Sequence, residues 1–215
     1  SPASGSPVID AADAFVAPFT DILDRPRSDD PGTADVGIGF DSYAITDEGS
    51  SLFTAGGVAQ NWRSTNTSWS LALPFAFPLY GQSYTDVRVS SNGFLQFGSI
   101  TDAFDGSNTQ AEFIERIRIA PLWDDIRTSV TGGDVFVDTA TAGQVTVRWA
   151  GQTEGGFQPV NFSVTLFATG AFRFDYGAGN TGLTPTVGVS AGNGEVFQLA
   201  PYNGLADLDG ADSLT

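Results

Sequence analysis

Strict alternation of apolar and polar residues is the feature of this sequence that most restricts its fold. In the stretch QVTVRWAG, Val145, Val147 and Trp149 alternate with Thr146 and Arg148. Because successive side chains of a strand point to opposite faces, the three apolar residues share one face and the polar residues the other. A helix would instead need apolar residues every three to four positions. The stretch is therefore predicted to be a half-buried β-strand.

The same alternation recurs in VNFSVTLFATGAFRFDYG on both sides of a short Thr169-Gly170 turn. The alternating apolar residues are Val160, Phe162, Val164 and Leu166 before the turn, and Phe172, Phe174 and Tyr176 after it. Two alternating runs joined by a short turn predict a β-hairpin. A second hairpin is predicted in YTDVRVSSNGFLQFG, where Asn92-Gly93 supplies the positive φ angles of a tight turn.

Further short apolar runs lie between Gly, Asn, Asp and Pro residues. They cover residues 36–45, 70–73, 113–120, 134–137, 186–190 and 196–200. About ten strands at this spacing are typical of a sandwich or barrel. No long helix is predicted, because TQAEFIERIRIAP begins like a helix but ends at Pro121. The fold predicted for residues 36–215 is a single all-β domain, an antiparallel β-sandwich of about ten strands.

Residues 1–35 have a different composition, rich in Pro, Ser, Asp and Ala. Their apolar islands include Val8, Ile9, Phe15, Val16 and Phe19. One interpretation is a disordered leader or linker. The other is an extended N-terminal arm whose apolar islands pack on the domain or on a neighbouring copy.

The composition removes most catalytic chemistry. The chain has no Cys, Met or His, and all nine of its Lys+Arg positions are arginines. It therefore lacks thiolate nucleophiles, disulfides, the usual general base and the usual zinc ligands. Without Lys it has neither a P-loop nor a Schiff base. Few hydrolytic mechanisms remain apart from paired carboxylates, so neither an enzymatic activity nor an organic cofactor is predicted.

The charge of the chain excludes two classes of partner. A formal net charge of -16 and a pI of about 4.1 would repel nucleic acids and anionic membrane surfaces. No apolar segment approaches the roughly 20 residues of a membrane-spanning helix. The sequence begins at Ser1 without a charged and apolar leader, so a secretory signal is expected to be absent or already removed.

Two glycine motifs resemble catalytic signatures. Residues 188–192 read GVSAG, like a nucleophile elbow, but the chain has no His to act as the base. Residues 177–182 read GAGNTG, like a dinucleotide fingerprint, but a strand-like segment with Pro185 follows in place of a helix. Both are interpreted as loops.

Three aspartates near the end of the sequence form the candidate metal site. Asp207, Asp209 and Asp212 surround Gly210 in DLDGAD, which resembles the start of a calcium loop. Calcium prefers several oxygen ligands on a tight turn. The bidentate acid of a full EF-hand is missing, so the alternative is a solvated acidic tail. Calcium is the one cofactor that the sequence suggests.

Aromatic residues suggest a second kind of site. Trp62, Trp69, Tyr84 and Tyr202 fall in predicted loops or at strand ends, where exposed rings could stack on sugars. The alternative is packing at the edge of the sandwich, since large aromatic residues dominate β cores.

The stretch IAPLWDDIR places two carboxylates together after a buried run. Neighbouring residues of a strand point to opposite faces, so Asp124 and Asp125 cannot share one cleft as a glycosidase pair if the strand continues through them. Either could still pair with a distant acid such as Glu154 or Asp175. A turn role is favoured, in which Trp123 is the anchor and the aspartates accept hydrogen bonds from loop amides.

Four segments together resemble a known family. They are LPFAFPLYGQSYTDVRVSSNGFLQFGS (73–99), IAPLWDDIRTSVTGGDVFVDT (119–139), VNFSVTLFATGAFRFDYG (160–177) and TVGVSAGNGE (186–195). Over about residues 69–199 the sequence resembles the nidogen-like extracellular domain, and especially its relatives in bacterial secreted and surface proteins. The resemblance implies an extracellular, non-catalytic β domain of adhesion and matrix proteins. It supplies no ligand residues, and the absence of cysteines differs from the animal members.

The resulting hypothesis is a secreted or cell-surface structural or adhesion module. Its copies are predicted to assemble into fibres when the arm of one copy adds a strand to the next. The expected partners are other copies, or another extracellular protein or glycan, with no nucleic acid and no membrane insertion. The alternative functions are a carbohydrate-binding module of a secreted hydrolase and a spacer within a larger protein.

Overall fold

The computed structural model describes residues 43–215. The predicted arm, residues 1–35, lies outside the described residues, and so does most of the strand predicted at 36–45. The elements are β1 (Val58–Ala59), β2 (Ser68–Leu79), β3 (Gln82–Ser90), β4 (Leu95–Gln96), α2 (Gln110–Ile114), β5 (Ile117–Trp123), β6 (Ile126–Arg127), β7 (Asp134–Asp138), β8 (Gln144–Thr153), β9 (Pro159–Phe167), β10 (Phe172–Tyr176), β11 (Thr186–Ala191) and β12 (Phe197–Leu199).

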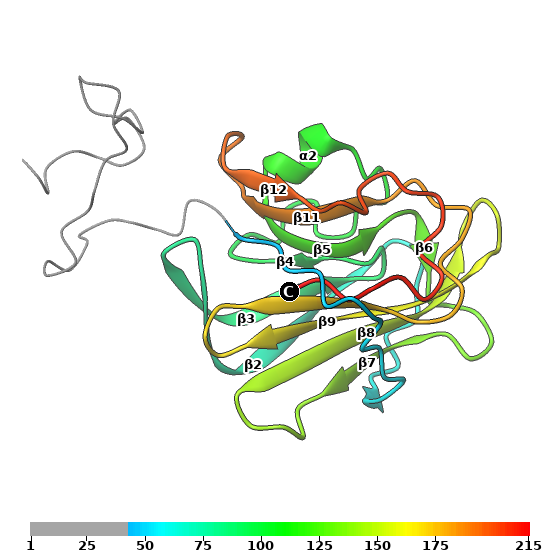
Figure 1. Cartoon of the computed structure of the whole chain (residues 1–215), viewed down its shortest axis with the longest axis horizontal. Helices are drawn as coiled ribbons and strands as arrows, with labels where there is room; N and C mark the ends of the chain where they lie inside the picture. Colours follow the sequence, from blue (N-terminus) through cyan, green and yellow to red (C-terminus); the bar gives the residue numbers. More distant parts are fainter. Residues whose placement is uncertain (1–42) are drawn as a thin grey trace, which may run out of the picture. The chain divides into compact units, whose positions relative to one another are not determined.

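The strands form two six-stranded sheets. The first sheet has the order β1-β7-β8-β9-β10, with β6 paired to β8, and the second has the order β12-β11-β5-β4-β3-β2. All pairings within both sheets are antiparallel. In Figure 1 the second sheet runs from β12 at the top to β2 at the lower left, and β7, β8 and β9 of the first sheet lie in the lower half. The predicted all-β antiparallel sandwich is confirmed.

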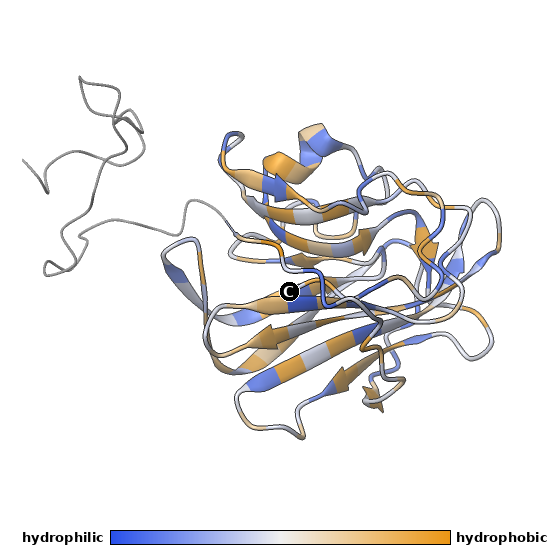
Figure 2. Cartoon of the chain, viewed as in Figure 1, coloured by the Kyte–Doolittle hydropathy of each residue, from blue (hydrophilic) through white to orange (hydrophobic). Residues whose placement is uncertain are grey.

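The core lies between the two sheets and is built from the alternating residues. Val145, Val147 and Trp149 of β8 are fully buried. The Trp149 ring stacks on Phe162 with centroids 5.3 Å apart, and its indole N–H donates to the Ser90 carbonyl at 2.7 Å. This bond joins β8 of the first sheet to β3 of the second. In Figure 2 apolar and polar residues alternate along these strands.

The segment predicted as a strand at 113–120 is divided between a short helix and a strand. Thr109 caps α2 by accepting a hydrogen bond from the Glu112 amide, and the Thr109 hydroxyl donates to the Glu112 carboxylate at 2.7 Å. Thr109 is therefore an N-cap residue whose side chain also bonds that of Glu112. Phe113 on the helix is buried with Phe94 and Trp123 on the outer face of the second sheet. The prediction was wrong here because a single capped turn carries too few residues to show helical periodicity.

The predicted hairpin around Asn92-Gly93 is present, but its turn differs from the prediction. Gly93 has a positive φ of 81°, whereas Asn92 does not. The Asn92 side chain instead accepts from the Ile126 amide at 3.0 Å and donates to Asn66 Oδ1 at 2.8 Å. Asn92 therefore holds neighbouring loops together.

Candidate functional site

The two ends of the described chain extend the first sheet beyond β10. The Leu214 amide donates to the Phe174 carbonyl at 3.0 Å, and the Phe174 amide donates to the Leu214 carbonyl at 2.8 Å. On its other side the C-terminal segment pairs with Thr46, whose amide and carbonyl both bond Thr215. The edge of β10 is therefore covered by the C-terminal segment. The side of the sandwich along which residues 43–46 run beside this segment is called the open side below (Figure 1).

An apolar pocket of about 150 Å³ lies at this open side. Five separate parts of the chain form its walls: the segment at residues 43–46, β10 with the residue before it, β11, β12 with the residue after it, and the C-terminal segment. The lining residues are Tyr43, Ala44, Ile45, Thr46, Ala171, Phe172, Phe174, Gly188, Val189, Gln198, Ala200, Leu214 and Thr215. None of these side chains is charged, so the pocket suits an uncharged apolar group.

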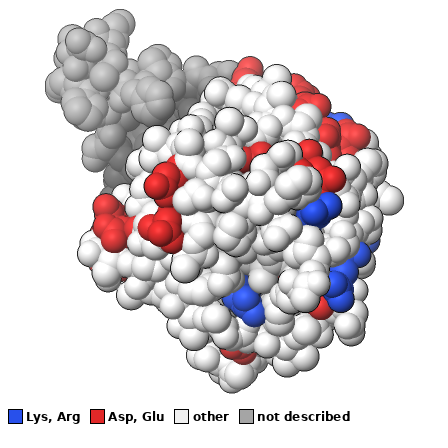
Figure 3. Space-filling model, turned by 90° about the vertical axis from the view of Figure 1, so that its right-hand side faces the viewer, with Lys and Arg blue, Asp and Glu red and all other residues white. Residues whose placement is uncertain are grey.

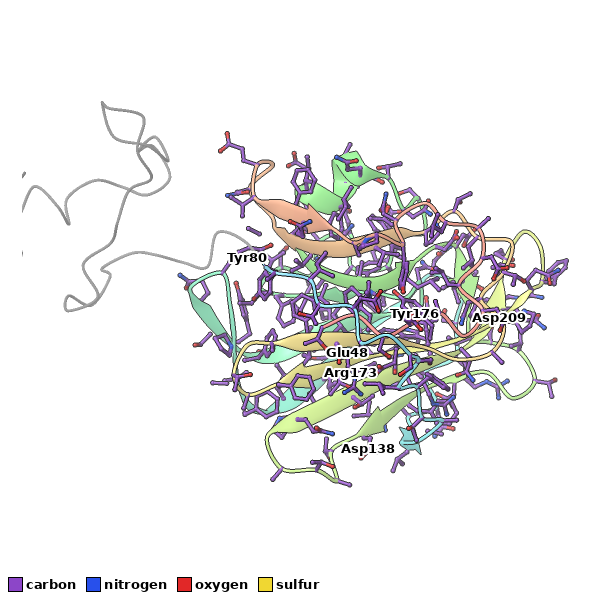
Figure 4. All side chains as sticks on the ribbon, viewed as in Figure 1. Glu48, Tyr80, Asp138, Arg173, Tyr176 and Asp209 are labelled. Carbon is purple, nitrogen blue, oxygen red and sulfur yellow. The ribbon has the colours of Figure 1, made fainter. Side chains whose placement is uncertain are left out.

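Tyr43 joins the pocket wall to the tip of the β2–β3 hairpin. Its ring meets Tyr80 edge-on at 5.4 Å and tilts against Phe172 at 4.9 Å. Burial raises the pKa of Tyr43 to about 12, and burial likewise raises the pKa of Tyr80. Figure 4 shows Tyr80 at the end of that hairpin, where it adopts a positive φ of 47° beside Gly81. This two-residue turn was missed from the sequence because Tyr-Gly is not a usual turn pair.

The strand edges differ in how readily they could accept another strand. β2 is a long edge, but Pro74 and Pro78 remove two of its amide donors. β1 has only two residues, and β10 is covered. The edge of β12, at Phe197–Leu199, lies beside the pocket. Among the described residues, the open side therefore combines a free sheet edge with an apolar pocket.

Of the two adjacent aspartates, Asp124 takes the turn role predicted for the pair. Asp124 accepts from the amides of Thr184 at 2.7 Å and of Asp125 at 2.8 Å, so it ties the end of β5 to a distant loop. Asp125 is exposed and its carboxylate lies near Glu154. Burial, followed by repulsion from Glu154 and from Asp124, raises the pKa of Asp125. Trp123 is fully buried, as the anchor role requires.

The structure brings two of the four predicted sugar-stacking residues together. Trp62 and Trp69 stack on each other with centroids 5.5 Å apart and an interplanar angle of 2°. Each ring therefore has one face covered by the other. Tyr84 tilts against Phe97, and Tyr202 meets the ring of Tyr176 edge-on. Glycan stacking by these four residues stays a prediction, which binding to a glycan array would test.

The three aspartates of the predicted calcium site lie in the loop that precedes the C-terminal segment, where Asp207 forms a β-bridge with Thr181. Asp209 accepts from the Gly179 amide at 2.8 Å, and Asp207 accepts from the Asp209 amide at 3.0 Å. In residues 43–215 no group of three or more acidic side chains is arranged to hold a metal ion. Figure 4 shows Asp209 at the right-hand edge of the domain. A calcium role for Asp207, Asp209 and Asp212 stays a prediction, which thermal unfolding with calcium and with a chelator would test.

A buried arginine was not predicted. Arg118 is fully buried on the outer face of the second sheet, between the rings of Phe94 at 4.6 Å and Trp123 at 4.5 Å. Its Nε donates to the Gln96 side chain at 2.9 Å, and its guanidinium also donates to the Asp102 carbonyl at 2.9 Å. Burial lowers the pKa of Arg118 to about 10. The group anchors the loop before α2.

The surface of the domain is acidic. Residues 43–215 carry 17 Asp and Glu side chains against seven Arg. Figure 3 shows both signs on one face, with acidic groups along its upper part and left side and arginines toward the right and below. The uncharged pocket therefore belongs to a domain that repels other acidic bodies at long range.

Within residues 43–215 no helix has the length and hydrophobicity needed to cross a membrane. A family model described as NIDO related matches residues 42–209, which extends the recognised similarity at both ends of 69–199. Neither the curated proteins nor the solved structures contain a significant match. Since the matched region includes every strand of both sheets, the chain belongs to the NIDO-related family.

Proposed function

We propose that the protein is an extracellular structural or adhesion module whose copies associate through their N-terminal arms. Membership of the NIDO-related family supports an extracellular module, because domains of this kind are generally extracellular and non-enzymatic. The composition agrees, since the chain lacks the His, Lys and Cys side chains that most catalytic mechanisms use.

One observation carries the association proposal. The chain enters the described domain at Tyr43–Thr46, and these residues form one wall of the apolar pocket at the open side of the sandwich. The preceding arm carries apolar islands, and the receiving side offers an apolar pocket beside the free edge of β12. An extended segment that pairs with a sheet edge and places side chains in a pocket is a known mode of recognition.

The proposal is tested by removing the apolar islands of the arm. We expect deletion of residues 1–35 to abolish association over a concentration series followed by light scattering and negative-stain imaging. A second variant keeps the length and charge of the arm but replaces five of its apolar residues with serine. These residues are Val8, Ile9, Phe15, Val16 and Phe19.

The serine variant distinguishes side-chain docking from other effects of the arm. Loss of association in both variants supports docking of the apolar side chains. Unchanged oligomers in the deletion variant would reject arm-mediated association. Association that is lost on deletion but kept in the serine variant would mean that the arm acts through its backbone, its charges or its remaining apolar residues Ile22 and Leu23.

A further inference from the structure

The pocket at the open side has the size of one aromatic ring. Its volume of about 150 Å³ is that of an apolar protein cavity able to accept benzene. Val189, Ala200 and Leu214 supply aliphatic wall, and Phe172 and Phe174 supply aromatic wall. A phenylalanine ring is close to benzene in size, so it matches this space.

The charge of the domain restricts the occupant further. No charged side chain lines the pocket, and burying a charge in such a place without a partner is costly. The side chain that enters is therefore uncharged, and it must be presented by a segment able to reach the open side.

The residues that precede the described domain include side chains of this kind. Residues 1–42 include three aromatic residues, Phe15, Phe19 and Phe40. Phe40 precedes Tyr43 by three positions, so it is tethered within about 10 Å of its own domain. Phe19 precedes Tyr43 by 24 positions, which gives a tether of about 80 Å when extended. Pro18 also disfavours a helical conformation at the residue before it, which suits an extended segment.

We propose that this pocket binds one phenylalanine ring from the Phe15–Phe19 stretch of a second copy of the chain. The inference rests on the proposed function and names its receiving site. Tyr43 is both the start of the described domain and a wall of the pocket, so each copy has the root of its arm beside its own receiving site. Two copies that face each other can therefore exchange both arms and fill both pockets.

Such a reciprocal exchange is a closed, two-fold arrangement in which both copies use the same surface. It leaves neither arm nor pocket free, so the first product expected is a dimer. Ile45 lines the pocket and is 38% exposed, and a second copy seated at the mouth would cover it. A longer array needs a chain of unreciprocated exchanges.

Complementary variants test this pairing in the full chain. F15A/F19A removes both rings from the arm but keeps the pocket open. A171W covers the pocket but keeps the arm, because Ala171 lines the pocket and is exposed, so a larger side chain there need not enter the core. Each variant lacks one half of the contact, so copies of the same variant cannot form the contact with each other. A178W is the matched control, since Ala178 is exposed but does not line the pocket.

We expect each variant alone to be monomeric and an equimolar mixture to form a 1:1 complex, measured by light scattering. Removal of a buried phenylalanine ring should weaken self-association by at least about 30-fold. The A178W control should associate like the unmodified chain. Circular dichroism and thermal unfolding would show whether A171W keeps the fold.

A direct measurement does not depend on A171W. Methyl resonances of Val189 and Ala200 in labelled F15A/F19A should shift when unlabelled wild-type chain is added, because an aromatic ring then enters the pocket. Absence of both the shift and the mixed complex, while the unmodified chain associates, would overturn the pocket assignment and leave the proposed function standing. If the unmodified chain never associates but the two variants form a mixed complex, the pocket assignment is supported and the proposed function is rejected.

Discussion

The Tyr176 hydroxyl donates a hydrogen bond of 2.7 Å to the carbonyl oxygen of Pro121. This bond joins β10 of the first sheet to β5 of the second, and both groups are buried. The register between β5 and β11 shifts between Thr186 and Gly188, so two residues of β5 lie opposite Val187. Such a bulge interrupts the ladder. Tyr176 thus supplies a donor to a buried carbonyl at this irregularity.

Replacing Tyr176 with Phe should therefore destabilise the domain while keeping its shape. The substitution leaves the Pro121 carbonyl buried without its donor, which costs about 1–3 kcal/mol. Denaturant unfolding should show a lower midpoint with an unchanged slope. A Y176F variant as stable as the unmodified chain would mean that the bond between the sheets contributes no net stability.

Stability should fall at alkaline pH because buried tyrosines stay neutral in the folded state. The pKa of Tyr43 is raised to about 12 and that of Tyr176 well above 10, in each case mainly by burial. The folded state therefore binds these protons more tightly than the unfolded chain. Their stabilisation is complete below about pH 10 and declines as pH rises through the folded pKa values.

The Y43F variant isolates one tyrosine from the rest. Arg118 acts in the opposite direction because its pKa is lowered, so the total slope mixes two signs. Between pH 9 and pH 11 the unmodified chain should lose up to about 1 kcal/mol more stability than Y43F. Denaturant titrations at both pH values measure this difference. Equal losses in the two proteins would contradict the burial of Tyr43.

Gly93 should tolerate no side chain. A Cβ there would lie 2.0 Å from the Leu122 carbonyl oxygen and 2.8 Å from Phe162 Cζ, at a φ of 81°. We expect G93A to cost at least about 3 kcal/mol or to prevent folding. G132A is the matched control, since Gly132 has a φ of 76° but a Cβ added there would meet no atom within 4 Å. The control should cost about 1 kcal/mol from backbone strain alone.

The two adjacent aspartates should differ in their effect on stability. Asp124 bonds the amides of Thr184 and Asp125, so D124A is expected to cost about 1–2 kcal/mol. Asp125 is exposed near Glu154, so D125A should change the stability by less than about 0.5 kcal/mol. Thermal unfolding of the two variants gives the comparison. A larger loss for D125A than for D124A would contradict the turn role assigned to Asp124.

Alternation predicted strands such as β8 because their apolar face is buried and polar residues occupy much of the other face. It underestimated β2, predicted at 70–73 and found at Ser68–Leu79, since an edge strand can continue through Pro74 and Pro78. It gave no sign that Arg118 is buried, because the covering of its side chain by α2 and the aromatic residues is not a local pattern. Local patterns do not reveal that the outer face of a sheet has a second cover.

The pocket could not be predicted from the sequence. Its walls come from five parts of the chain, and residues such as Tyr43, Phe174 and Ala200 look like ordinary core or strand positions. Only the pairing of the C-terminal segment with β10 and with Thr46 brings these parts together. The arm, by contrast, was recognised from its composition, because its apolar islands stand among acidic and turn-forming residues.

The most direct test of arm-mediated association is the molar mass of the full chain by light scattering at low and high salt. The arm and the domain are both acidic, and the proposed contact is apolar. Screening of their repulsion should therefore strengthen association. We expect the molar mass of the unmodified chain to rise with salt. The molar mass of the serine-substituted arm variant should stay at that of a monomer. A mass that falls with salt, or that is the same in both proteins, would contradict arm-mediated association.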